Sequence, residues 1–77
     1  MAAKLHYSMI IKWSDEDSLF IVQIPEFEGA VTHGKTYEKA VKMGIDLIET
    51  FVYIYKEDGV PLPSPNKYHS EELSAEG

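Results

Sequence analysis

The sequence predicts an α+β domain in which a three-stranded antiparallel sheet packs on one long helix. Three observations predict this fold: three short segments with strand character come first, turn residues separate them, and one run with helical periodicity follows. The chain has 77 residues, which is the length of one domain rather than two. A chain of this length buries only about 60–65% of its unfolded surface, so its own core is expected to be marginal.

The first two strands are expected to form a hairpin. Apolar and polar side chains alternate over residues 5–13, with Leu5, Tyr7, Met9, Ile11 and Trp13 on one face, as in a half-buried strand. A polar turn at 14–18 leads to a second strand at 19–24, and a short turn between neighbouring strands indicates a hairpin. Pro25 ends this strand because proline cannot donate to a sheet ladder.

A short third strand and a long helix follow. The strand is expected at 30–33 and stops at Gly34. The helix is expected over about 37–56, with Thr36 as its N-cap and Glu38 in the first turn, where the helix dipole favours an anion. The apolar residues of this helix recur at steps of three and four: Tyr37, Ala40, Val41, Ile45, Ile48, Phe51, Val52 and Tyr55.

The apolar stripe of this helix is wider than one small sheet needs. Leu47 and Ile54 lie beside the main stripe. The excess is explained either by a broad core face or by a second packing surface, for another copy or for a partner. On the second explanation we expect an oligomer interface at Leu47, Phe51 and Ile54.

The helix is expected to stop at Asp58-Gly59. Residues 60–65 contain three prolines, so this segment can join the sheet only as a short fourth edge strand. Residues 66–77 are polar. We therefore expect a single domain over 1–65 and a flexible polar tail over 66–77.

Charge and composition narrow the classes of function. The formal net charge is −6, all seven basic residues are lysines, and there is no cysteine. An acidic chain without arginine is a poor candidate for binding DNA or RNA directly, but it suits a basic protein partner. The longest apolar runs are too short to span a membrane, and no apolar run follows the first lysine as a signal peptide requires. We therefore expect a cytoplasmic protein with no membrane contact.

Residues 29–36 match the phosphate-loop pattern G-x-x-x-x-G-K-S/T and precede the expected helix. Glu26 and Glu28 lie just before the pattern and would repel a triphosphate. Val31 and Thr32 are typical of a strand rather than of a loop, and no later apolar strand ends in an aspartate that could hold magnesium. We interpret the match as turn and cap chemistry, without a nucleotide.

Other candidate chemistry is equally weak. His6, His33 and His69 are scattered, although the first two would be neighbours if their strands paired. The acidic turn at 15–17 lacks the spacing and the closing glutamate of a calcium loop. The two loop carboxylates before the phosphate-loop pattern have no nucleophile or base beside them. We expect no catalysis, no metal site and no cofactor.

The order of these elements resembles the HicB antitoxin family. Four segments carry the resemblance: 7–11, 20–29, 32–40 and 61–63. The resemblance implies a partial RNase H-like fold that assembles into dimers or tetramers. It also implies that the chain neutralises HicA, a small basic toxin that cleaves mRNA, by protein–protein binding.

Two departures from the family pattern matter. Ala30 and Lys35 stand where the family often has cysteine and aspartate. The sequence after the helix also holds nothing able to form the DNA-binding domain of many members, so direct DNA binding is not expected. The residues that we expect to contact a partner are Glu26, Phe27, Glu28, Asp46 and Glu49.

Two other functions stay open. One is an orphan self-assembling domain with an unknown partner or ligand and no toxin. The other is a degenerate nuclease, which would need carboxylates gathered around metal ions. The interiors of the first two expected strands contain no carboxylate, which disfavours the nuclease.

Overall fold

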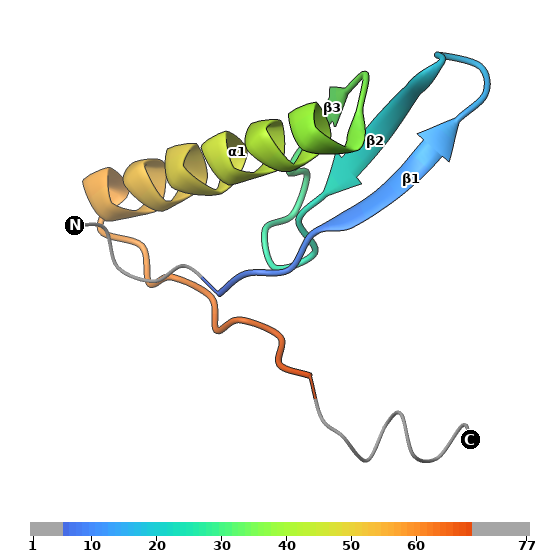
Figure 1. Cartoon of the computed structure of the whole chain (residues 1–77). Coiled ribbons are helices and arrows are strands. Elements are labelled where there is room, and N and C mark those ends of the chain that lie inside the picture. Colours follow the sequence, from blue (N-terminus) through green and yellow to red (C-terminus); the bar gives the residue numbers. More distant parts are fainter. Residues whose placement is uncertain (1–5, 69–77) are drawn as a thin grey trace.

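The computed structural model describes residues 6–68. Within this range the elements are β1 (Ile10–Ser14), β2 (Leu19–Gln23), β3 (Val31–Gly34) and α1 (Tyr37–Asp58). The strands pair antiparallel in the order β1-β2-β3, and α1 lies across one face of the sheet (Figure 1). The expected three-stranded α+β fold is thereby confirmed.

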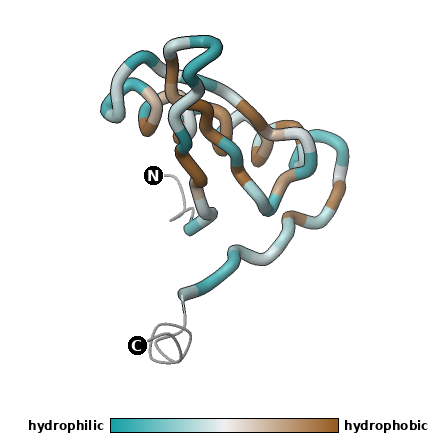
Figure 2. The backbone as a smooth tube through the Cα atoms, turned by 90° about the vertical axis from the view of Figure 1, so that its right-hand side faces the viewer, coloured by the Kyte–Doolittle hydropathy of each residue, from teal (hydrophilic) through white to brown (hydrophobic). Residues whose placement is uncertain are grey.

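The two faces of the sheet have different surroundings. Trp13 pairs with Phe20, and Ile11 pairs with Val22, so these four side chains lie on the same face of the sheet as α1. Figure 2 shows that the apolar stretches of the chain gather in the strands and in α1. The opposite face has no helix over it among residues 6–68, and it mixes apolar and polar side chains: Ile10, Lys12, Leu19, Ile21, Gln23, Val31 and His33.

The start of the first strand differs from the prediction. β1 begins at Ile10 rather than near residue 5 and continues to Ser14. Tyr7 and Met9 are half-buried and pack against the core from outside the sheet. The reason is a contact with the loop after β2: the Ser8 amide donates to the side chain of Glu26 instead of to a neighbouring strand. Leu5 lies outside the described residues.

The helix begins and ends with the expected caps. Thr36 Oγ1 accepts a hydrogen bond from the Lys39 amide at 3.1 Å. Gly59 adopts a left-handed conformation with φ of 69°, and its amide caps the last turn, as is common at helix ends. The helix continues to Asp58, two residues beyond the expected end at Lys56.

The buried line of α1 is narrower than the predicted stripe. It consists of Ala40, Gly44, Ile48 and Val52. The helix axis comes very close to β3, because a Cβ placed on Gly34 would lie 2.5 Å from the backbone nitrogen of Ala40. This close approach leaves β1 largely uncovered. Tyr37, Val41 and Ile45, which the periodicity assigned to the stripe, are therefore exposed.

The core is completed by a loop residue. Phe27 is 2% exposed, and its ring contacts those of Tyr7, Phe51 and Tyr55 at centroid distances of 4.9, 5.3 and 5.2 Å. Hydrogen bonds between backbone groups of Ile24, Phe27 and Ala30 fold the loop so that this ring points inward. The remaining buried hydrophobic residues are Val22, Ile24, Ala30, Ala40, Ile48 and Val52.

The segment after α1 returns toward the N-terminal segment without joining the sheet. Residues 60–68 adopt no strand, so the expected fourth edge strand is absent from the described residues. The segment is held instead by Tyr7, whose hydroxyl donates to the carbonyl oxygen of Pro63 at 2.6 Å. The Asn66 amide is also bound, so the first residue of the predicted tail is anchored. Residues 69–77 of that tail lie outside the described residues.

Candidate functional site

An exposed aromatic cluster lies beside the N-terminal end of α1. We use this name for Trp13, Phe20 and Tyr37. Phe20 stacks on Tyr37 at 4.2 Å and meets Trp13 edge-on at 5.0 Å. Trp13 is 51% exposed and Tyr37 is 66% exposed. Contiguous exposed apolar surface of this kind marks interaction sites in soluble proteins.

The aromatic cluster continues along the helix. Val41 and Ile45 follow Tyr37 at four-residue spacing and are also exposed, so the three side chains form one edge of α1. Acidic groups border this surface. Trp13 Nε1 donates to Asp15 Oδ1 at 2.8 Å, and Glu38 occupies the first helical turn. The surface therefore combines an apolar centre with an acidic rim.

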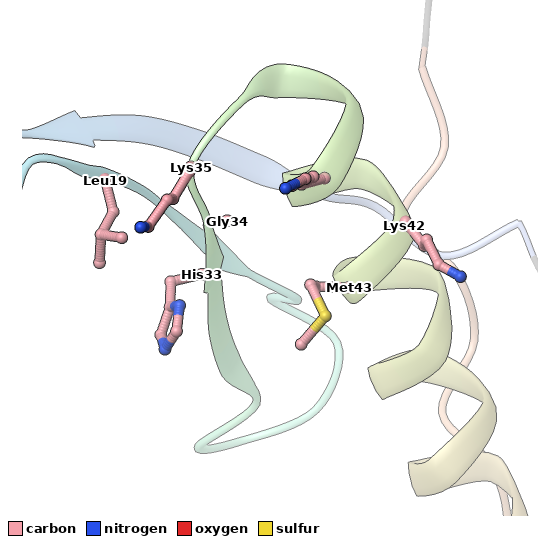
Figure 3. A pocket seen from close by; sticks show the side chains of 7 residues that line it. Leu19, His33, Gly34, Lys35, Lys42 and Met43 are labelled. Atoms are coloured by element: carbon pink, nitrogen blue, oxygen red, sulfur yellow. The ribbon is translucent and has the colours of Figure 1, made fainter.

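A groove of about 430 Å³ lies at the free side of β3. We call it the edge groove; it is lined by Leu19, His33, Gly34, Lys35, Lys39, Lys42 and Met43. Figure 3 shows Met43 reaching from α1 toward β3, with Leu19, His33 and Lys35 on the far side of the strand. Lys42 also lines the groove, but its side chain runs away from Met43 (Figure 3). No carboxylate lines this groove, although the chain carries a net charge of −6.

Glu26 ties its own loop to two segments that are distant in sequence, around Ser8 and around Asn66. Its carboxylate accepts hydrogen bonds from the Ser8 amide, from Ser8 Oγ at 2.9 Å and from the Asn66 amide at 2.8 Å. Burial by itself would raise the pKa of Glu26, but these hydrogen bonds outweigh it and hold the pKa below its ordinary value. Burial, and then the charge of Glu26, raise the pKa of Tyr7. We call this arrangement the Glu26 clamp.

The five residues expected at a partner interface are not brought together. The carboxylate of Glu26 is engaged in the clamp, and Phe27 lies in the core rather than on the surface, because its loop folds inward. Glu28 is exposed in the loop. Asp46 and Glu49 are exposed on the outer side of α1.

The residues expected at an oligomer interface also differ in exposure. Leu47 and Phe51 are half-buried and pack against the core, which agrees with a broad core face at these two positions. Ile54 is 45% exposed. An oligomer interface at this position stays a prediction.

The remaining candidate motifs take structural roles. The phosphate-loop match at 29–36 forms a turn, then β3, then the N-cap Thr36. His6 and His33 are not paired, because β2 lies between β1 and β3 and His6 precedes β1. Within residues 6–68 no three His, Asp or Glu side chains gather in a way that could hold a metal ion. His69 lies outside this range.

Sequence reasoning missed two features of this surface. The edge groove depends on how α1 sits over β3, and the only hint of it was the lysine spacing at 35, 39 and 42. Gly44 lies where α1 crosses Met9 and Val22. A glycine inside an otherwise apolar helix is a signal for such a close approach.

Comparison of the chain with known protein families, with curated proteins and with solved structures finds no match. Across residues 6–68 the structure contains no helix that is both long and apolar enough to cross a membrane.

Proposed function

We propose that this chain is a protein-binding domain of the antitoxin type, which neutralises a small basic mRNA-cleaving toxin by covering its surface. One observation carries the proposal: the aromatic cluster and the adjoining helix edge expose Trp13, Tyr37, Val41 and Ile45 as one surface. Aromatic side chains are the anchors that dominate binding energy at protein interfaces. A monomer gains nothing from leaving them in water.

The charge of the chain supports a basic partner. Acidic residues Asp15, Glu16 and Asp17 lie two to four residues after Trp13, and Glu38 follows Tyr37. Charges at the rim of an interface speed encounter and select partners of opposite sign. The resemblance of segments 7–11, 20–29, 32–40 and 61–63 to HicB antitoxins supports a HicA-like toxin in particular.

A second candidate function is an orphan self-assembling domain with no toxin. The same exposed surface favours it, because an aromatic cluster can pack on its own copy in a symmetric dimer. The sheet face without a helix, which carries Ile10, Ile21 and Val31, offers a further contact for a tetramer. In this case the oligomer would form without any basic partner.

The test is to sequence the genes beside this one and to coexpress the chain with any small basic protein that they encode. The wild-type chain is expected to relieve growth arrest by that protein and to copurify with it. Tyr37→Ser is expected to abolish both effects, whereas Tyr53→Ser, also on α1 and 64% exposed, should leave both intact. Circular dichroism confirms that both variants are folded.

Two outcomes contradict the antitoxin proposal. One is a neighbouring basic toxin that the chain neither binds nor neutralises. The other is equal activity of Tyr37→Ser and Tyr53→Ser. Light scattering of the purified chain separates the second candidate function: a dimer or tetramer that Tyr37→Ser dissociates, with no toxin activity encoded nearby, favours the orphan domain.

A further inference from the structure

β3 is an edge strand whose free side is bordered by the edge groove. Among residues 6–68 its only strand neighbour is β2. One side of its backbone is therefore available to hydrogen-bond an added strand. The groove is lined by His33 and Gly34 of β3 (Figure 3); His33 is exposed, whereas Gly34 is buried against the backbone of Ala40.

The two walls of the groove are chemically similar. The wall on the sheet side has Leu19 and Lys35 (Figure 3), and the wall on the helix side is formed by Met43 together with Lys39 and Lys42 of α1. A strand laid along β3 would send successive side chains to opposite sides. Each side of such a strand would meet one apolar side chain and at least one ammonium group.

We propose that the edge groove binds an extended acidic peptide segment of another protein, which adds to β3 as a fourth strand. The backbone of the segment pairs with β3, its aliphatic side chains cover Leu19 and Met43, and its carboxylates reach Lys35 and Lys39. Main-chain pairing supplies affinity in this mode of recognition, and the flanking side chains supply specificity.

Charge complementarity selects the ligand. Three of the seven lysines in the chain line this one groove, and none of its lining residues is acidic. The lysines are spread over the turn before α1 and over its first two turns, which suits several carboxylates along a peptide better than one small anion. Their stems add apolar surface while their ammonium groups stay in water.

This site is distinct from the surface in the proposed function. The proposed toxin is basic and contacts Trp13 and Tyr37 on the β1 side, whereas the groove takes an acidic segment on the β3 side. Either proposal can therefore fail without the other. Because β3 has four residues, the pairing is short, and we expect a weak, transient interaction.

The test uses a fluorescein-labelled peptide, Glu-Glu-Leu-Val-Glu-Glu, which places carboxylates and one aliphatic group on each side of a strand. Its control replaces every Glu by Gln. Fluorescence anisotropy is expected to show binding of the acidic peptide at least tenfold tighter than binding of the control. Lys35→Ala and Lys39→Ala are each expected to weaken binding about threefold, as for exposed ion pairs, and 0.5 M salt should weaken it further.

A matched variant and a structural readout complete the test. Lys56→Ala removes a lysine from the last turn of α1, away from the groove, and should leave affinity unchanged. In NMR hydrogen exchange, amides within Val31–Gly34 are expected to gain protection when the peptide binds. A strand added to β3 requires this protection, whereas simple charge attraction does not.

Four results would overturn the proposal. The first is equal affinity for the Glu and Gln peptides, and the second is a loss of affinity in Lys56→Ala as large as in the groove variants. The third is no new protection of the β3 amides. The fourth is that decanoate, a small anion with one apolar chain, displaces the peptide and binds as tightly as the peptide does. A fifth concerns residues 71–76, Glu-Glu-Leu-Ser-Ala-Glu, which resemble the probe. If replacing Glu71, Glu72 and Glu76 by Gln tightens peptide binding tenfold, the chain itself supplies the occupant and the proposed partner is wrong.

Discussion

The two ends of α1 carry similar aromatic contacts but differ in what covers them. Near the C-terminal end, Phe27 meets Phe51 and Tyr55 at 5.3 and 5.2 Å and is buried. Near the N-terminal end, Phe20 meets Trp13 and Tyr37 at 5.0 and 4.2 Å, and both partners are more than half exposed. The chain closes one end with its own loop and C-terminal segment. The closed end therefore stabilises the fold, and the open end is the one to which we assign binding in the proposed function.

The largest expected effect tests the closed end. Phe27→Ala should lower the free energy of unfolding by about 3–5 kcal/mol, because it leaves a cavity among three aromatic rings. That is a large part of the total stability of a domain this small. Trp13→Ala, its counterpart at the open end, should cost less than about 1 kcal/mol. Urea unfolding monitored by circular dichroism checks both, and equal losses would refute the division between the two ends.

A second prediction compares two glycines of the structure, Gly34 and Gly44, to locate the contact that fixes α1 on the sheet. Gly34→Ala places a Cβ 2.5 Å from the backbone of Ala40, so α1 must shift, at a cost of about 1–3 kcal/mol. Gly44→Ala meets mainly the flexible side chain of Met9 and gains about 1 kcal/mol of helix propensity, so its net change should be small. Thermal unfolding compares them, and the reverse order would show that α1 is not seated on β3 through Gly34.

The smallest expected effect concerns the Glu26 clamp. The pKa of Glu26 is lowered in the folded state, so its stabilisation is fully present above the unfolded pKa, near 4.5, and is lost as pH falls through the folded pKa. Glu26→Gln should cost about 1 kcal/mol at pH 7. The difference from wild type should shrink below pH 4.5. Urea midpoints measured from pH 7 to pH 3 check this, and a gap that is constant with pH would exclude the charge as its cause.

The helix and its ends were predictable because their signals are local. Thr36 and Gly59 act through their own side chain or backbone, and both were identified from the sequence. The start of β1 was not predictable from alternation, because the Ser8 amide is taken by Glu26, eighteen residues away. Phe27 was misplaced for a similar reason: it lies in a loop, and only tertiary contacts turn it inward.

The candidate surfaces were less predictable than the fold. The width of the helical stripe indicated that α1 has more apolar surface than the sheet covers. Which residues stay exposed, among them Val41 and Ile45, depends on how closely α1 packs on Gly34. The edge groove combines Leu19 with residues from β3 and α1. Such a combination depends on strand order, which no local pattern contains.

The Glu26 clamp also has a consequence for the order of folding. The hydrogen bond from Asn66 spans 40 residues, and the one from Tyr7 to Pro63 spans 56. Contacts so distant in sequence form late, because the entropy of closing long loops opposes them. The hairpin, β3 and α1 need neither of these contacts, so they can assemble first. Until residues 63 and 66 are in place, the N-terminal segment that carries Tyr7 and the loop that carries Glu26 are not tied to the segment after α1, so this end of the helix is expected to close last.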